Sequence, residues 1–259
     1  MQRRQFHAGL WSGLLGLSAC GSLFGRNKTA SEANGLDGMW KIEKRLNHAT
    51  NTVRATGLQG YRMMLGGHLA MIFYRPAGND FVGAIAGTFD RLANGHVREN
   101  YRLFNFGSDQ EPHSIDFEAH ADADTYEHVC LGMYGFSETY KRVRLSNKAR
   151  IPQGLWQIDD PPLNLPLRDK AQLKGVRLAL GDYTIDIYNQ NTFEFRAATL
   201  GQWSKSGNGV VYTPLVQSWS RDAKDLALAL IELSDDEWKV EGSDGRQQRF
   251  RRLDAYESA

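Results

Sequence analysis

GVRLALGDYTIDIY, at residues 175–188, is the stretch that decides the fold of this chain. Its second half, 183–188, alternates apolar and polar side chains with the period of a half-buried β-strand. The two-residue connection Gly181-Asp182 joins this strand to the apolar run at 176–180, and such a tight turn needs a positive φ, which glycine adopts readily. The stretch therefore predicts a β-hairpin whose isoleucine-bearing face points into a core.

A second copy of this hairpin lies earlier in the chain, where residues 60–66 (GYRMMLG) align with residues 175–181 (GVRLALG). Further matches keep the same order. They pair Gly38-Met39-Trp40 with Gly154-Leu155-Trp156, Phe81 with Phe195, Gly87 with Gly201, Phe89 with Trp203, and Tyr140-Lys141-Arg142-Val143 with Phe250-Arg251-Arg252-Leu253. An ordered series of this kind indicates an internal duplication. It predicts two domains, at 36–146 and 150–254.

Each copy contains about eight strand-like segments separated by turn residues. In the first copy they follow Trp40 at 61–65, 68–74, 81–89, 96–104, 114–119, 125–130 and 136–143. Eight antiparallel strands in sequential order close into an up-and-down barrel, which leaves no exposed edge. We therefore predict an all-β fold of two tandem eight-stranded antiparallel barrels. The interior of such a barrel holds side chains and at most one small ligand.

The pattern Gly-x-Trp opens both copies, and an arginine stands near the end of each. The pairs are Trp40 with Arg142 and Trp156 with Arg252. This arrangement resembles the signature of the lipocalin (calycin) family, and the glycine-linked strands are similar to the lipocalin-like domains of bacterial lipoproteins. The resemblance implies that each arginine covers its tryptophan and closes its barrel. This chain lacks the disulfides of secreted animal lipocalins.

The N-terminal segment 1–19 has the features of a cleaved export signal, with Arg3 and Arg4 before a short apolar run. Leu17-Ser18-Ala19-Cys20 resembles the bacterial lipobox, which implies that Cys20 becomes the lipidated first residue of the mature chain. The alternative is a plain secretory signal with a chance cysteine. Residues 3–6 (RRQF) resemble the twin-arginine motif, with the general secretory route as the alternative.

Residues 20–35 are expected to form a flexible tether between the lipid and the folded body. Gly21 stands where aspartate would favour inner-membrane retention, so the expected location is the outer membrane, facing the periplasm. After Cys20 only Cys130 remains, which excludes an intramolecular disulfide within the mature chain. The formal net charge of +1, with scattered basic residues, argues against a nucleic-acid partner.

Glu99 is the residue for which a purely structural role is hardest to explain. In the segment 96–104 it shares the apolar face with Val97, Tyr101 and Leu103, where an unpaired carboxylate is costly. The aligned residue of the second copy is Thr213. One interpretation is a buried ion pair, with Arg62 as the candidate partner, or a bulge that turns the side chain outward. The other is a ligand-binding or catalytic carboxylate.

His68 has the same parity as Ala70 and Ile72, which places it on an apolar strand face. Either it is a hydrogen-bonded core histidine, or it joins Glu99 and Tyr101 in a polar cluster at the floor of the first barrel. The candidate ligand-binding residues are Glu99, Tyr101, His68 and Arg62. The histidines lack metal-ligand spacing, and no cofactor motif is recognisable, so neither a metal nor a cofactor is expected.

The strand at 68–74 is apolar on both faces, because Leu69, Met71 and Phe73 replace Thr184, Asp186 and Tyr188 of the second copy. Something is therefore expected to cover its outside. The simplest cover is the other barrel. A partner protein or the membrane surface is the alternative.

Three functions fit these observations. The first is a lipoprotein that binds a small apolar or amphipathic ligand in one or both barrels. The second is an isomerase, hydratase or cyclase on an apolar substrate, with Glu99 as general acid/base and His68 or Tyr101 orienting the substrate. The third is a structural or assembly lipoprotein with filled barrels, which is favoured by a bulky set expected to point inward: Phe81, Phe89, Phe195 and Trp203.

Overall fold

The computed structural model describes residues 35–54, 57–105, 113–130, 135–160, 162–163, 173–190, 195–220 and 224–254. The export signal, Cys20 and the tether as far as residue 34 lie outside these ranges. All regular structure in the described ranges is β. They contain no helix with the length and hydrophobicity needed to cross a membrane.

The first barrel closes through hydrogen bonds between its first and last strands, β1 and β9. In chain order its strands are β1 (Gly38–Asn47), β3 (Gln59–Leu65), β4 (His68–Arg75), β5 (Asp80–Arg91), β6 (Val97–Asn105), β7 (His113–Ala121), β8 (Thr125–Cys130) and β9 (Phe136–Arg142). The short strand β2 (Thr52–Arg54) pairs with the far end of β1 outside the barrel, an addition that the sequence did not predict.

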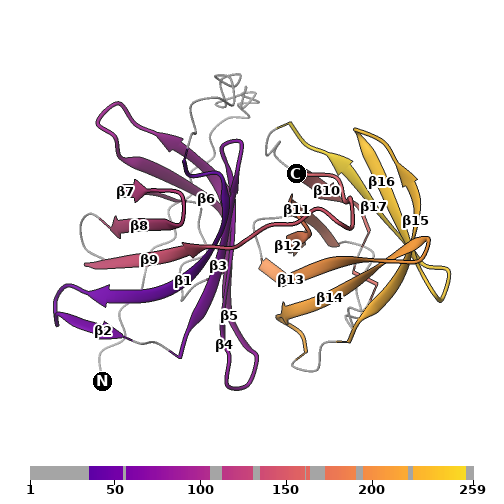
Figure 1. The fold of residues 1–259 in the computed structure, drawn as a ribbon, viewed down its shortest axis with the longest axis horizontal. Coiled ribbons are helices and arrows are strands. Elements are labelled where there is room, and N and C mark those ends of the chain that lie inside the picture. The colour runs from indigo at the N-terminus through magenta and orange to yellow at the C-terminus, as the bar shows by residue number, and fades with distance from the viewer. Residues whose placement is uncertain are drawn as a thin grey trace, which may run out of the picture.

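The second barrel is likewise closed and antiparallel. Its strands are β10 (Gly154–Ile158), β11 (Leu173–Leu180), β12 (Tyr183–Gln190), β13 (Phe195–Ser206), β14 (Gly209–Gln217), β15 (Leu226–Leu233), β16 (Glu237–Gly242) and β17 (Gln247–Arg252). The two eight-stranded barrels confirm the predicted fold and stand side by side (Figure 1).

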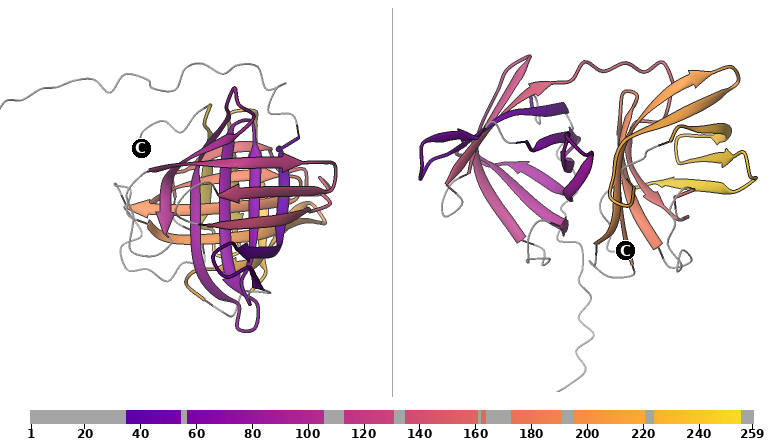
Figure 2. Two further views of the ribbon diagram at one scale, coloured as in Figure 1. Left: turned by 90° about the vertical axis from the view of Figure 1, so that its left-hand side faces the viewer. Right: turned by 90° about the horizontal axis from the view of Figure 1, so that it is seen from below.

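The deciding hairpin has the predicted turn. Gly181 has φ 62°, and its counterparts Gly66 and Gly67 have φ 58° and 85°, so the turns use the left-handed region that glycine tolerates. Asp182 has a separate role. Its carboxylate accepts hydrogen bonds from the Ser146 hydroxyl and from the backbone nitrogens of Lys148 and Ala149. These residues belong to the segment that joins the two barrels (Figure 2), so Asp182 holds that segment in place.

The barrels pack on each other through strands β3–β6 and β11–β14. Strands β3–β6 of barrel one correspond to strands β11–β14 of barrel two, and the contacts are reciprocal. The contact of β4 with β13 is matched by that of β5 with β12, and the contact of β6 with β13 is matched by that of β5 with β14. Two copies related by a two-fold axis would meet in this way. The interface is a buried apolar cluster of matched residues: Met39, Met63, Ala70, Ile72, Ala84, Ala86 and Leu103 from barrel one, with Leu155, Leu178, Ile185, Ile187, Ala198, Leu200 and Val216 from barrel two.

This interface corrects the predicted direction of the hairpin. Ile185 and Ile187 pack against the other barrel, whereas Thr184, Asp186 and Tyr188 on the opposite face are buried as well. Both faces of β12 are therefore covered, and the polar face is the one inside the barrel. The polar face is tolerated there because Arg177 supplies a partner for Asp186. The expectation that the other barrel covers the apolar strand of copy one agrees with the packing.

Two further side chains point away from the interior instead of into it. Phe81 and Phe195 stack on each other across the interface, with ring centroids 5.7 Å apart and planes 10° apart. Phe89 and Trp203 do lie in the barrel cores. A bulge skips Arg102 in the pairing of β5 with β6, so Tyr101 faces the interior while Leu103 joins the interface.

Candidate functional site in the first barrel

An arginine covers a tryptophan at one end of each barrel. The guanidinium carbon of Arg142 lies 4.0 Å from the ring centroid of Trp40, and that of Arg252 lies 4.4 Å from Trp156. Both tryptophans are fully buried. The Trp40 indole donates a hydrogen bond to the Leu36 carbonyl oxygen at 2.9 Å. These contacts close the ends of the barrels.

Glu99 lies in the interior of barrel one as half of a buried ion pair. Arg62 on β3 donates to Glu99 Oε1 through Nη1, and the Tyr101 hydroxyl donates to Oε2 at 2.8 Å. Both partners of the ion pair are almost fully buried. Burial lowers the pKa of Arg62, but the Glu99 carboxylate together with Tyr140, Tyr126 and Tyr101 more than compensates, so this pKa stands well above its usual value. Burial and the adjacent Glu99 raise the pKa of Tyr101.

A second polar group stands on the closing strands. Glu138 on β9 accepts a hydrogen bond from the Tyr140 hydroxyl, and its Oε1 lies 3.3 Å from Arg45 Nε on β1. The Arg45 guanidinium carbon is 3.9 Å from the ring centroid of Phe136. Glu138 is buried, whereas the Arg45 side chain is 27 % exposed. This ion pair therefore connects the interior with the surface.

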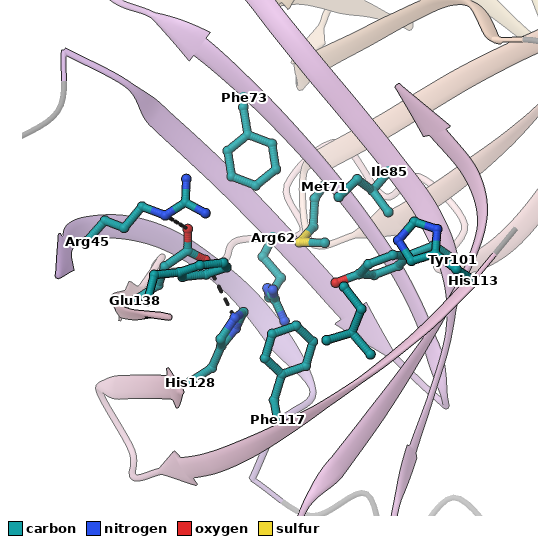
Figure 3. Close-up of a pocket in the computed structure, with 12 residues that line it drawn as sticks. Arg45, Arg62, Met71, Phe73, Ile85, Tyr101, His113, Phe117, His128 and Glu138 are labelled. Atoms are coloured by element: carbon teal, nitrogen blue, oxygen red, sulfur yellow. Dashed lines mark ion pairs between the residues drawn. The ribbon is translucent and has the colours of Figure 1, made fainter. Parts of the chain in front are cut away.

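Between the two ion pairs lies a cavity of about 130 Å³ (Figure 3). Most of its wall is aliphatic or aromatic, and its polar side chains include both arginines. The lining residues are Arg45, Arg62, Met71, Phe73, Ile85, Tyr101, His113, Ile115, Phe117, His128, Phe136 and Glu138. The combination of an apolar wall with a few polar groups is typical of small-molecule sites.

His128 is the most unusual residue of this wall. It is 2 % exposed, and its ring is packed against Phe117 with centroids 4.0 Å apart. Neither ring nitrogen has a hydrogen-bond partner, and Nε2 lies 3.7 Å from Glu138 Oε2. Burial, with the charges of Arg62 and Arg45, holds the pKa of His128 well below its usual value. The imidazole is therefore neutral at pH 7 and has unused hydrogen-bonding capacity.

The structure separates the four residues that the sequence grouped as a ligand-binding set. Arg62 and Tyr101 line the cavity, and Glu99 binds both of them. His68 does not join them, because its position on β4 places it on the face with Ala70, toward barrel two. There it interacts with the backbone of Asp254, and burial lowers its pKa. Of the two interpretations of His68, these contacts agree with the core histidine and not with the polar cluster, because its strand face points toward the other barrel.

His128, Glu138 and Arg45 were not anticipated as site residues. A signal was present, because alternation in 125–130 places His128 on the face of Tyr126 and Cys130, all three of them buried. In the same way, Glu138 shares a face of 136–142 with Tyr140 and Arg142. Starting from the arginine that covers Trp40 and counting back by twos would have placed Glu138 inside the barrel.

Barrel two contains a related ion pair, and aromatic rings surround it in the part of this barrel that the structure describes. Arg177, the counterpart of Arg62, donates to Asp186 through Nε at 2.7 Å and Nη2 at 2.6 Å. The sequence alignment pointed to Thr213 as the counterpart of Glu99, but the strand register corrects this. Glu99 is opposite Phe89, and Tyr212 is opposite Trp203, the counterpart of Phe89, so Tyr212 is the counterpart of Glu99. Aromatic side chains fill this core: Trp156, Tyr188, Trp203, Tyr212, Trp238 and Phe250.

No family model matches this sequence, and no curated protein or solved structure matches it significantly. The fold itself is a pair of tandem lipocalin-like barrels, as judged from strand number, order and closure. Within the described ranges, no three His, Cys, Asp or Glu side chains are grouped as metal ligands would be. The function must therefore be argued from the geometry of the cavity.

Proposed function

We propose that this chain is a lipid-anchored periplasmic lipoprotein whose first barrel binds a small apolar or amphipathic ligand. The cavity of about 130 Å³ in that barrel carries the proposal, because its apolar wall surrounds the buried groups Arg62, Glu138 and His128. An apolar wall favours an apolar body, and a few polar groups at one place fix the orientation of a head group.

The size of the cavity limits the ligand. Pockets for drug-sized molecules measure roughly 300–1,000 Å³, whereas an apolar cavity of about 150 Å³ accepts benzene. A cavity of about 130 Å³ suits one ring or a short chain. The half-buried side chains Arg45, His113 and Phe136 belong to its wall, so a longer molecule has a route to the surface beside them.

In this proposal barrel two binds no ligand and supports the strands of barrel one that form the cavity. Its core is occupied by aromatic rings, including Trp203 and Trp238 with centroids 5.5 Å apart. Through the matched interface, barrel two makes a large apolar contact with strands β3, β4, β5 and β6. These strands carry four residues of the cavity wall: Arg62, Met71, Ile85 and Tyr101.

The cellular location is the second part of the proposal, and it rests on the sequence of residues 1–20. A lipid on Cys20 would hold both barrels at the outer membrane, facing the periplasm. Cys20→Ser should abolish incorporation of labelled palmitate and release a soluble periplasmic form. Labelled lipid on the Cys20→Ser chain would refute the anchoring.

Native mass spectrometry of the purified full chain tests ligand binding. We expect a small molecule of low mass to co-purify with the wild type and to be lost from Ile115→Phe, which fills the cavity. Leu226→Phe is the matched control, because Leu226 pairs with Tyr212 as Ile115 pairs with Glu99. A bound mass that persists in Ile115→Phe and disappears in Leu226→Phe would place the site in barrel two and contradict the proposal.

A further inference from the structure

The charges around the cavity of barrel one are balanced before any ligand arrives. Arg62 is paired with Glu99, and Arg45 is paired with Glu138. Three of these four side chains are almost fully buried. A charged head group added beside them would have no opposite charge to neutralise it, and an unpaired charge in a buried site is costly.

The groups that remain unused are suited to hydrogen bonds with a neutral partner. Arg62 Nε is buried and donates to no acceptor in the structure, and both nitrogens of His128 are equally without partners. A neutral imidazole provides one donor and one acceptor. A ligand that satisfies these atoms must therefore accept a hydrogen bond and also donate one.

The side chains that carry these groups face the same space. Figure 3 shows the Arg62 guanidinium directed toward His128 and Phe117, and a dashed line joins His128 to Glu138. The ring of Phe117 packs on the imidazole, and Phe73, Phe136 and Tyr101 add further aromatic rings to the wall. A planar ring of the ligand can pack among these aromatic side chains while its substituent reaches the polar groups.

We propose that this cavity selects a ring-sized ligand with an uncharged head group that both accepts and donates hydrogen bonds, a hydroxyl or a carboxamide. Carboxylates and ammonium or amidinium groups are rejected, because the two arginines already have their carboxylates. This assignment rests on the proposed function, since it names the ligand class of that same cavity.

Four probes of nearly equal shape separate the possibilities: benzamide, benzoate, benzamidinium and toluene. Binding of each to the full chain carrying Cys20→Ser is measured near pH 7.5 by calorimetry or ligand-observed NMR. We expect benzamide to bind at least about tenfold more tightly than the other three, a difference equivalent to about 1.4 kcal/mol. The anion and the cation lose affinity through uncompensated charge, and toluene leaves the buried polar atoms without partners.

A pair of variants locates the head group. Glu99→Gln removes the carboxylate from Arg62, and we expect it to reverse the order so that benzoate binds more tightly than benzamide. Asp186→Asn is the matched control, because it removes the carboxylate from the other buried arginine, outside the cavity. It should leave the wild-type order unchanged. A reversal in Asp186→Asn, or none in a folded Glu99→Gln chain, overturns the assignment.

The wild-type series decides the question even where a variant fails to fold. Benzoate, benzamidinium or toluene binding as tightly as benzamide would overturn the head-group assignment and leave the ligand-binding proposal standing. Binding of none of the four probes would remove both.

Discussion

The two barrels share a framework and a buried arginine but have opposite interiors. In barrel two, Arg177 and Asp186 form two short hydrogen bonds inside a core filled with aromatic rings. In barrel one, Arg62 meets Glu99 through a single nitrogen, and a cavity remains beside the pair. The carboxylate stands on β12 in barrel two and on β6 in barrel one, whereas the two arginines occupy matched positions on β11 and β3. A duplicated fold can thus keep its ion pair and still free the space that a ligand needs.

The closing strands show the same difference. Register places Val240 opposite Gln248 where barrel one has His128 opposite Glu138. The residues of barrel two at these positions are uncharged and buried, with Gln248 hydrogen-bonded to the Tyr188 hydroxyl at 3.2 Å. The ionisable residues of barrel one are therefore not required by the framework, which is a reason to assign them to a site.

Removing one partner of each ion pair should give the largest difference between the barrels. We expect Asp186→Asn to lower the free energy of unfolding by about 3–5 kcal/mol, because Arg177 is left charged and buried. Glu99→Gln also leaves a buried arginine without its carboxylate, but it should cost less, about 1–3 kcal/mol, since Arg62 loses one hydrogen bond where Arg177 loses two, and its Nη1 keeps the Tyr126 hydroxyl as an acceptor. Urea denaturation measures both. Equal losses would mean that Glu99 is scaffold in the same sense as Asp186.

The exposed pair Arg246–Asp244 provides the control for this measurement. Asp244→Asn should leave the unfolding curve unchanged, because an ion pair in water contributes little.

The reciprocal interface predicts equal costs at matched positions. Ile72→Ala and Ile187→Ala each remove part of a buried side chain from the shared cluster. We expect each to cost about 2–5 kcal/mol, with similar values for the two. Ile231→Ala, at a side chain that is 48 % exposed, is the control and should have a small effect. A large asymmetry between the two interface variants would argue against the two-fold relation.

Acid should act on barrel one through His128. A histidine in an unfolded chain titrates near pH 6.5, and in the folded barrel this pKa is well below that value. The unfolded chain therefore binds an extra proton once the pH falls below about 6.5. Stability is complete above that pH and decreases below it, by at most about 1.4 kcal/mol per pH unit.

His128→Val introduces the residue that barrel two has at this position and should remove that part of the acid sensitivity. Unfolding midpoints between pH 5 and pH 8 measure the effect. His120→Val, at an exposed histidine, should retain the wild-type pH profile. A His128→Val chain with the same acid sensitivity as wild type would show that the imidazole is not the buried neutral group described.

The smallest expected effect is at the closed ends of the barrels. Arg142→Met and Arg252→Met each remove a guanidinium that lies over a buried tryptophan. Loss of the cation–π contact should cost about 0.5–2 kcal/mol in each barrel. The hydrogen bonds that the two arginines donate to backbone carbonyl oxygens are lost with it in both barrels, for example from Arg142 to Asp37 and from Arg252 to Gln153. Thermal melts of the two variants should therefore shift in the same direction and by similar amounts. A shift in only one of them would show that the two ends are not equivalent.

Much of the architecture followed from the sequence, because strand alternation and tight turns are local properties. The hairpin at 175–188 and its earlier copy predicted both barrels and their order. The direction of each strand face did not follow, because alternation defines two faces without saying which is inside. Ile185 and Ile187 were assigned to the interior on hydrophobicity, and a second barrel made the outside equally apolar.

Only part of the candidate site could be predicted from the sequence, because alternation does not say which strand face points into the barrel. Glu99 and Arg62 were identified because a carboxylate on an apolar face is conspicuous. His68 was placed on the correct strand face, with Ala70 and Ile72, but that face points toward barrel two. His128 and Glu138 become a pair only when β8 and β9 are in register, and the sequence did not supply that register.

Crystals of the full chain under xenon pressure would show whether barrel one contains an open apolar cavity and barrel two does not, because xenon enters apolar cavities whatever the head group of the natural ligand. We expect xenon density in barrel one, between Phe117 and Met71 beside Arg62, and none inside barrel two. Xenon among the tryptophans of barrel two, with an unoccupied first barrel, would contradict this expectation.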